Sequence, residues 1–390
     1  MLSGRPQAPL NLDRIPPLPP GETWGLYVHV PFCRKACHYC DFYFTPRSSL
    51  MEAYVEALLT EIELYRPLLE ATRIETVFFG GGTPSWLPIP LLERIFRRLE
   101  RLTTFAPQEL TLEANPEDLT LEKLGAWRAL GITRLSVGIQ SFSPAVLRTL
   151  GRWHRPGQAQ KAIQAVTQMG WTRWSADLLF AVPGQSWQTL QADIDFLVSE
   201  GVPHLSFYGL TLEPRTVLYK KYQRGRFPAV DEEAYVEQYE ALHAYLKEKG
   251  FEWYEVSNWA RPGHECQHNW RYWLRRPYLG LGPSAHSYVP EVRWANRANL
   301  LSYLEEVERG ELPWAFWEAL TPEQIELEVW MTGLRTRLGV DGAWVERCAS
   351  ASSRERIAAQ LRAGVLVYSE GRLFVRPEKL ALLDSILIAL

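Results

Sequence analysis

The sequence is poor in cysteine and methionine and carries almost no net charge. Its 390 residues include five cysteines and four methionines, and the formal net charge is -3. An odd number of cysteines argues against a framework of paired disulfides and favours free, ligating or reactive thiols. A slightly acidic chain also lacks the basic surplus typical of proteins that bind nucleic acid, so we expect no nucleic-acid partner.

Long hydrophobic runs are missing as well. No apolar stretch approaches the roughly 18 residues that a membrane span requires, and the N-terminus lacks the basic and then apolar order of a signal peptide. We therefore expect no transmembrane segment and a cytoplasmic location. With 46% hydrophobic and 22% charged residues, the composition is that of a globular chain, long enough for one large core and a smaller satellite domain.

Short apolar runs alternate with amphipathic helices over more than half of the chain. Residues 1–23 are rich in proline and predict an extended tail outside the core. From Trp24 onward, apolar runs are each followed by helical patterns. The apolar runs are residues 24–30, 76–80, 109–114, 133–139, 174–182 and 204–210. The helical patterns are residues 51–67, 88–101, 121–130, 144–150, 156–169, 187–199 and 231–249.

This alternation predicts an α/β fold with a partial (β/α)6 barrel over residues 24–250. Strands that are apolar on both faces suit burial beneath helices, and crossovers between parallel strands are right-handed. In such a sheet, ligands bind at the carboxyl ends of the strands. We therefore place the site in the loops that follow the strands, of which the first contains VPFCRKACHYCDF, residues 30–42.

Three of the five cysteines lie in this first loop. Cys33, Cys37 and Cys40 have the spacing C-x3-C-x2-C, which chance rarely produces in a chain with so few cysteines. Three thiolates suit a 4Fe-4S cluster in which the protein holds three irons and the fourth iron is open to another ligand. A structural zinc site is the alternative, and it needs a fourth ligand. Three residues are near enough in sequence to supply it: His38, Asp41 and His29.

The motif C-x3-C-x2-C, with the aromatic Tyr39 before its last cysteine and a (β/α)6 pattern around it, resembles the radical S-adenosylmethionine superfamily. In that superfamily the open iron binds the amino and carboxylate groups of the methionine moiety. The resemblance therefore implies two cofactors, a 4Fe-4S cluster held by the three cysteines and S-adenosylmethionine bound beside it.

Further residues at strand ends are similar to cofactor contacts of that superfamily. GGGTP, residues 80–84, resembles its methionine-binding glycine motif and makes Gly81, Gly82 and Thr83 candidates, although a tight turn alone would explain the glycines. Polar residues in or after apolar strands are costly to bury without partners, so they should face a polar cavity or cap a neighbouring helix. The polar residues of this kind are Glu113, Gln140 and Asp177. The remaining candidate contacts are Arg152, Tyr27 and Tyr39.

The string YVHVPFCRKACHYCDF, residues 27–42, resembles one branch of the superfamily, the oxygen-independent coproporphyrinogen III oxidases and the related heme chaperones. The oxidases carry an additional cysteine two residues after the third, where this sequence has Phe42. The resemblance therefore implies a heme chaperone that delivers heme to an acceptor hemoprotein, with an oxidase of coproporphyrinogen as the alternative. No catalytic residue is assigned, and the cleavage of S-adenosylmethionine, the heme attachment and a possible homodimer stay open.

A second motif lies in residues 251–320, which we expect to form a heme-motif region and a connecting segment. HECQHNWRYW, residues 264–273, contains the pattern H-N-x-x-Y-W, which resembles the heme chaperones. The pattern consists of His268, Asn269, Tyr272 and Trp273. Flat aromatic rings and arginines suit the faces and the propionates of a heme. The side chains of these kinds are Trp270, Tyr272, Trp273, Arg271, Arg275 and Arg276.

Two side chains of this motif offer recognised axial ligand types for heme, the imidazole of His268 and the thiol of Cys266. Two alternatives stay open. A histidine among aromatic residues is often a hydrogen-bonded core residue. Together with His264, Cys266 and His268 would also suit zinc.

Residues 321–390 predict a small α+β unit of winged-helix type. A capped amphipathic helix begins at Thr321, a second helix spans residues 352–363, and residues 366–375 predict a hairpin. The second helix carries few arginines in a chain of negative net charge, so we expect packing or partner docking rather than DNA binding. Cys348 has no partner nearby and is expected to be a buried small residue.

Overall fold

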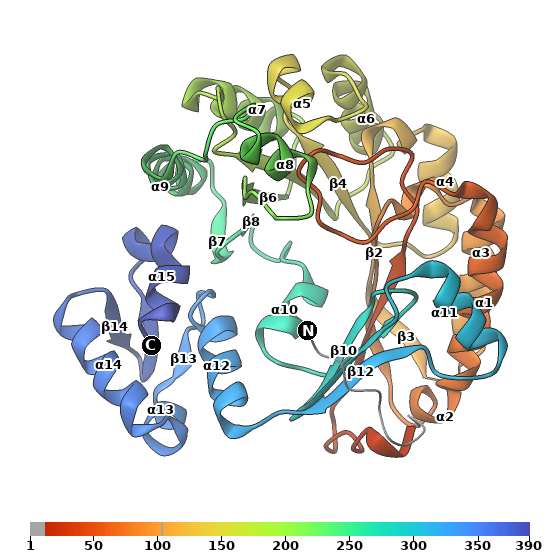
Figure 1. The fold of residues 1–390 in the computed structure, drawn as a ribbon. Coiled ribbons are helices and arrows are strands. Elements are labelled where there is room, and N and C mark those ends of the chain that lie inside the picture. The colour runs from red at the N-terminus through yellow and green to blue at the C-terminus, as the bar shows by residue number, and fades with distance from the viewer. Residues whose placement is uncertain (1–11, 103) are drawn as a thin grey trace.

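The main body of the molecule is one curved sheet with helices along its outer side (Figure 1). The computed structural model describes residues 12–102 and 104–390, so residues 1–11 of the expected tail lie outside the described residues. Within the described residues the sheet has 12 strands, in the order β12-β11-β10-β9-β1-β2-β3-β4-β5-β6-β8-β7.

Six parallel strands form the centre of this sheet, as the sequence predicts. They are β1 (Trp24–Val30), β2 (Ile74–Gly81), β3 (Phe105–Ala114), β4 (Arg134–Gln140), β5 (Trp174–Phe180) and β6 (His204–Gly209). The helices that follow them are α1 (Met51–Leu64), α2 (Arg66–Leu69), α3 (Ile89–Glu100), α4 (Leu121–Ala129), α5 (Pro144–Leu150), α6 (Pro156–Gln168), α7 (Trp187–Ser199), α8 (Val217–Gln223) and α9 (Glu232–Glu248). The expected (β/α)6 part is therefore confirmed, and α8 is an addition to it.

The register of the sheet brings two sequence motifs together. Val30, the last residue of β1, pairs with Gly81, the last residue of β2. Because neighbouring parallel strands end at the same edge, the cysteine loop after β1 and the glycine motif after β2 leave the sheet side by side. The amide of Gly82 then donates to the carbonyl oxygen of Val30 at 2.9 Å, which fixes the two loops to each other.

Residues 251–320 extend the sheet at both edges, where the sequence predicted a connecting segment. The added elements are β7 (Glu252–Glu255), β8 (Asn258–Ala260), α10 (Gln267–Trp273), β9 (Tyr278–Leu281), β10 (His286–Val289), β11 (Val292–Asn296), α11 (Leu300–Glu308) and β12 (Trp314–Ala319). β9 is parallel to β1, whereas β10 to β12 follow in antiparallel order. These strands are too short for a clear alternating pattern. Helix α10 lies on the concave side of the sheet (Figure 1).

The C-terminal unit has the helix and strand order of a winged helix. Its elements are α12 (Pro322–Gly333), β13 (Val340–Asp341), α13 (Gly342–Cys348), α14 (Ala351–Arg362), β14 (Leu366–Ser369), β15 (Arg372–Val375) and α15 (Leu383–Ile388). Thr321 caps α12 with the expected reciprocal hydrogen bonds to Gln324. The prediction for Cys348 is wrong: this residue ends α13 and is exposed, because it lies beyond the part of the short helix that Val345 anchors in the core.

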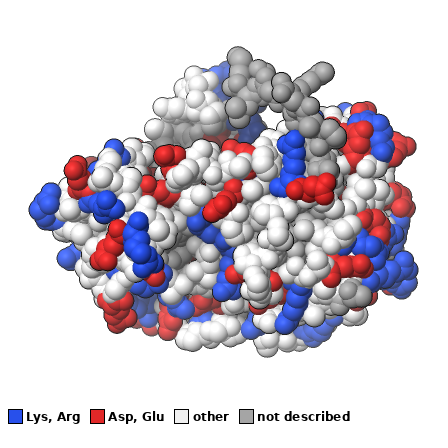
Figure 2. Space-filling view, turned by 90° about the horizontal axis from the view of Figure 1, so that it is seen from below, with Lys and Arg blue, Asp and Glu red and all other residues white. Residues whose placement is uncertain are grey.

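The described part of the proline-rich segment contacts the main body. A short 3-10 helix, Leu12–Arg14, leads to Ile15, whose side chain is buried in the main core. The prediction that residues 1–23 lie outside the core is therefore wrong at Ile15, because this apolar side chain packs into the main core. On the face shown in Figure 2, Lys and Arg side chains are interspersed with Asp and Glu. No helix in residues 12–102 or 104–390 combines the length and the apolar character that crossing a bilayer would require.

A buried carboxylate ties α1 to the added strands. Glu61 is fully buried and accepts hydrogen bonds from the Tyr303 hydroxyl at 2.7 Å, the Gly282 amide at 2.8 Å and the Asn296 side-chain amide at 2.6 Å. Burial raises the pKa of Glu61 to about 7. The carboxylate is thus the shared acceptor for three groups that lie 221, 235 and 242 positions away from Glu61 in the sequence.

Replacing Glu61 by alanine should destabilise the fold strongly. The substitution leaves three buried donors without their acceptor, and each unsatisfied buried group costs about 1–3 kcal/mol. We expect the free energy of unfolding, measured in urea, to fall by about 3 kcal/mol or more. The exposed Glu56→Ala is the control and should change it by less than about 1 kcal/mol. Equal small losses in both variants would contradict the role of Glu61.

Candidate functional site

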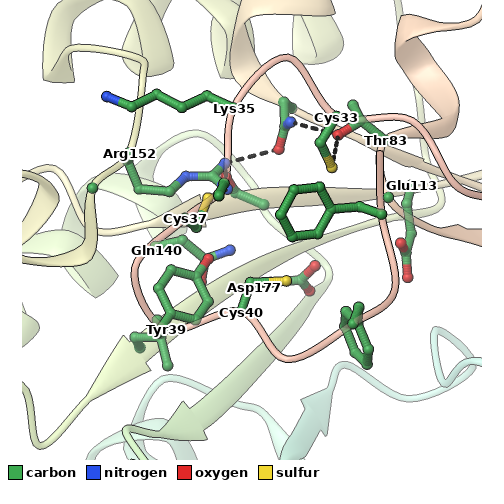
Figure 3. A pocket seen from close by; sticks show the side chains of 18 of the residues that line it. Cys33, Lys35, Cys37, Tyr39, Cys40, Thr83, Glu113, Gln140, Arg152 and Asp177 are labelled. Atoms are coloured by element: carbon green, nitrogen blue, oxygen red, sulfur yellow. Dashed lines mark hydrogen bonds between the residues drawn. The ribbon is translucent and has the colours of Figure 1, made fainter. Parts of the chain in front are cut away.

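The three cysteines of the first loop line one cavity of about 410 Å³ at the carboxyl ends of the parallel strands (Figure 3). The same cavity is lined by nearly all of the predicted S-adenosylmethionine contacts. These are Tyr39, Gly81, Gly82, Thr83, Glu113, Gln140, Arg152 and Asp177. Tyr27 is the exception, because it lines a second, larger cavity next to the first. The cavity thus combines predicted contacts from the ends of five strands and the loops that follow them, as expected for a ligand site in a parallel sheet.

The candidates for a fourth zinc ligand point to other partners. Nδ1 of His38 lies 3.0 Å from the carbonyl oxygen of Thr149, and Asp41 forms an ion pair with Arg215. Both ring nitrogens of His29 are engaged, one by the Tyr27 hydroxyl and one by the Tyr43 carbonyl oxygen. Among the described residues, no group of three or more His, Cys, Asp or Glu side chains is arranged to hold a single metal ion. Each of the three candidates for a fourth zinc ligand is therefore engaged by another group.

A chain of hydrogen bonds connects two of the cysteines across the cavity (Figure 3). Cys33 Sγ lies 3.3 Å from Thr83 Oγ1, which also accepts from Asn115 Nδ2 at 3.2 Å. Arg152 donates to Asn115 Oδ1 at 2.8 Å and to Cys37 Sγ at 3.5 Å. Asn115 was missed by the sequence analysis, although it directly follows β3 and lies two residues after Glu113. The network holds the cysteine loop against the ends of β2, β3 and β4.

The pocket favours the protonated form of two of the three thiols. Burial raises the pKa of Cys33 to about 12 and that of Cys40 to about 11. The hydrogen bond from Thr83 and the charge of Arg152 act in the opposite direction for Cys33. Because iron binds thiolates, assembly of a cluster on these side chains has to release their protons.

The glycine motif allows close approach of two backbone segments. Gly81 has φ +103°, a conformation that residues with a side chain rarely adopt. A Cβ on Gly82 would lie 2.7 Å from the carbonyl oxygen of Phe32, which directly precedes Cys33. The glycines are thus required by the turn itself, and they also place the Gly81 amide 3.2 Å from Glu113 Oε2 at the cavity.

Two half-buried carboxyl groups face the same cavity. Burial, and secondarily the charge of Asp177, raises the pKa of Glu113 to about 8. Burial raises the pKa of Asp177 to about 6, and its Oδ1 atom is buried without a hydrogen-bond partner. A cationic group in the cavity would compensate this desolvation and favour both carboxylates. The site is therefore suited to a ligand that carries positive charge.

These polar residues do not cap the neighbouring helices, which have their own N-cap residues. The N-caps of α4, α5 and α7 are Thr120, Ser143 and Ser186. Gln140 has φ +66°, and the pairing of β4 with β5 shifts between Gly138 and Gln140. A non-glycine residue in this region stores backbone strain, and such strain is concentrated at ligand sites.

The two predicted heme ligands are enclosed in the protein interior. His268 and Cys266 are both fully buried, and neither lines the two cavities. The ring nitrogens of His268 lie 2.8 Å from the hydroxyls of Thr76 and Tyr272, and the Cys266 thiol donates to the buried carboxylate of Glu109. In this conformation, His268 is a hydrogen-bonded core histidine, which is one of the alternatives that the sequence left open. Zinc at Cys266, His264 and His268 is not assembled either.

Other residues of the H-N-x-x-Y-W region do reach a cavity. Tyr272, Trp273 and Arg275 line the larger cavity next to the cysteines. Arg271 is buried and bound to Glu75, so it is committed to an internal ion pair. The remaining candidates lie elsewhere: Trp270 and Arg276 line a separate, smaller pocket, and no contact in the described residues places Asn269 at either cavity.

A (β/α)6 sheet with three cysteines at the end of its first strand defines a radical S-adenosylmethionine fold, and the Radical SAM superfamily matches residues 27–197. Curated relatives extend over more of the chain. The heme chaperone HemW of Mycobacterium tuberculosis (strain H37Rv) is 38% identical over 385 residues, 97% of each chain. HemW of Bacillus subtilis (strain 168) is 35% identical over 321 residues, 80% of this chain and 84% of that protein. The chain belongs to the HemW heme chaperone family.

A solved structure confirms the architecture. Coproporphyrinogen III oxidase (HemN) from Escherichia coli superposes with a TM-score of 0.82 and covers 94% of this chain and 90% of its own. Its sequence identity is 22%, so the comparison concerns the fold alone. The family resemblance seen in the sequence and the predicted fold class are both confirmed.

Proposed function

We propose that this protein is a heme chaperone that binds a 4Fe-4S cluster, S-adenosylmethionine and heme, and delivers heme to an acceptor hemoprotein in the cytoplasm. The observation that carries the proposal is the 38% identity to a HemW protein over 97% of both chains. The arrangement of the cysteine cavity supports the two resident cofactors, and the larger cavity supports heme.

Cys33, Cys37 and Cys40 would hold three irons of the cluster, because all three thiols line one cavity. When bound, the cluster supplies an open iron for a chelating ligand. Arg152 would stabilise the thiolate of Cys37, to which it already donates. The cavity beyond the thiols is the space for S-adenosylmethionine.

Glu113 and Asp177 would bind the positive charge of S-adenosylmethionine. Both carboxyl groups line the cavity, are half-buried and have raised pKa values, and the buried Oδ1 atom of Asp177 has no partner. A sulfonium or ammonium group satisfies such groups better than a neutral ligand would. The Gly81 amide orients Glu113, and Ser136 donates to Asp177 at 2.9 Å.

The residue at position 42 favours the chaperone over the oxidase alternative. Phe42 replaces the additional cysteine of the oxidases, and its side chain is 69% exposed at the rim shared by both cavities. An aromatic ring offers an apolar contact to a flat ligand but no thiol for redox or ligand chemistry. The similarity of the fold to that of an oxidase does not contradict the assignment as a heme chaperone, since one fold can support different functions.

The proposal is tested by heme binding and release. Cluster-loaded protein is titrated with ferric heme, and the heme-loaded form is then mixed with an apocytochrome of the b type. We expect saturation at about one heme per chain, and a transfer to the apocytochrome that is faster than from heme-loaded serum albumin. Heme binding that does not saturate, or no transfer beyond the albumin control, would contradict the proposal.

A further inference from the structure

We propose that the heme lies in the larger cavity next to the cysteines, with His286 as an axial ligand to its iron. This inference rests on the proposed heme function and assigns its site. The cavity has a volume of about 910 Å³, within the range of about 300–1,000 Å³ that is usual for small-molecule and cofactor sites. It lies beside the cysteine cavity, and Cys40 and Phe42 line both.

The walls of this cavity are aromatic and come from elements far apart in the sequence. β1, α10, β9 and β10 each contribute a tyrosine: Tyr27, Tyr272, Tyr278 and Tyr288. Trp273 adds an indole ring, and the guanidinium of Arg335 lies over it at 4.0 Å from the ring centroid. Flat apolar rings on several sides suit a planar, apolar ligand of the size of a porphyrin.

Two histidines line the cavity, and they differ in the state of their ring nitrogens. Both nitrogens of His29 are hydrogen-bonded, to the Tyr27 hydroxyl and the Tyr43 carbonyl oxygen. His286, at the start of β10, has no side-chain hydrogen bond among the described residues, and its ring lies edge-on to that of Phe316 at a centroid distance of 5.9 Å. His286 therefore offers a free imidazole to the cavity. Partial desolvation and the charge of Arg293 lower the pKa of His286, in the direction that favours the neutral imidazole, the form that ligates iron.

Two arginines in the same cavity have spare donors for carboxylates. Arg275 and Arg293 both donate to Glu328 of α12, and Arg293 also pairs with Glu318. Nη1 of Arg275 and Nη2 of Arg293 have no hydrogen-bond partner among the described residues. Since a guanidinium presents several donors in a fixed geometry, these atoms suit the propionates of a heme.

His268 then acts as a positioning residue. Its Nε2 atom lies 2.8 Å from the hydroxyl of Tyr272, and its Nδ1 atom lies 2.8 Å from the hydroxyl of Thr76 in β2. Through these contacts it anchors α10 to the sheet and holds the Tyr272 ring in the cavity wall. The H-N-x-x-Y-W pattern of α10 would thus contribute walls to the site, while the iron ligand His286 comes from β10.

Heme titrations of three alanine variants test the assignment. His286→Ala removes the proposed ligand, His268→Ala removes the positioning residue, and His243→Ala removes a histidine outside the cavity. We expect His286→Ala to shift the Soret band and to weaken heme binding by about tenfold or more, with added imidazole restoring the wild-type spectrum. His268→Ala should retain the wild-type ligation spectrum, and His243→Ala should match the wild type throughout.

The outcomes separate this inference from the proposed function. A wild-type spectrum and affinity in His286→Ala overturn the assignment of the ligand, and a spectral change in His268→Ala alone identifies the buried histidine as the ligand instead. If the wild-type chain binds no heme, the proposed function itself is contradicted, whatever the result for His286→Ala. Iron content and circular dichroism of each variant, compared with those of the wild type, verify that the fold and the cluster are intact.

Discussion

Replacing Cys37 by serine should remove the iron-sulfur cluster from the protein. Anaerobically reconstituted wild-type protein is expected to hold about four irons and four sulfides per chain, with three cysteine ligands. Cys37 is the middle cysteine of the motif, lines the cavity and accepts a hydrogen bond from Arg152. A hydroxyl is a poor ligand for iron, so we expect the iron content of Cys37→Ser to fall below about one per chain, with loss of the charge-transfer absorbance.

Cys348→Ser is the matched control, because it removes an exposed thiol far from the motif in sequence and outside the cavity. Its iron content should equal that of the wild type. A full cluster in Cys37→Ser would show that the motif does not hold the cluster. Stoichiometric zinc in place of iron in the wild-type protein would mean that the thiols form a structural zinc site.

Replacing Glu113 by glutamine should weaken the binding of S-adenosylmethionine by about thirtyfold, because a charge-assisted contact to a buried ligand contributes about 2 kcal/mol. Glu113 faces the cavity but contacts no cysteine, so the iron content should remain unchanged. Calorimetry on cluster-loaded protein measures the affinity. Glu122→Gln on the exposed face of α4 is the control and should bind like the wild type.

The pH dependence of this affinity provides an independent readout. The pKa of Glu113 is raised to about 8 by burial, so the free protein carries it mostly protonated at neutral pH. A cationic ligand requires the ionised form, so below pH 8 its binding must release a proton from Glu113. The affinity should therefore weaken by up to about tenfold for each unit by which the pH falls below 8. Glu113→Gln should lack this contribution. Identical affinities or identical pH slopes in the variant and the wild type would refute the contact.

Periodicity and connectivity made the centre of the fold predictable. Buried parallel strands read as apolar runs, and each was separated from the next by a helix, so the order of β1 to β6 followed from the sequence. The position of the cysteine cavity followed as well, since parallel strands gather the loops after them at one edge. Local motifs on separate strands could thus be assigned to one site before their contacts were known.

The contacts that depend on distant segments could not be predicted. Whether His268 faces a cavity or the core is decided by Thr76, which is 192 positions away. Asn115 gained its role because Thr83 and Arg152 lie on both sides of it in space. The edge strands β7 to β12 were missed because each has only three to six residues and a mixture of aromatic and polar side chains.

The choice between heme chaperone and oxidase is tested most directly by offering one anaerobic preparation both ligands. Cluster-loaded protein with S-adenosylmethionine and a reductant is incubated with coproporphyrinogen III, and a second portion is titrated with heme. We predict that heme binds at about one per chain, while coproporphyrinogen III is recovered unchanged and adds no 5'-deoxyadenosine above the substrate-free background. Decarboxylation of coproporphyrinogen III with matching formation of 5'-deoxyadenosine would contradict the assignment and identify the chain as an oxidase despite Phe42.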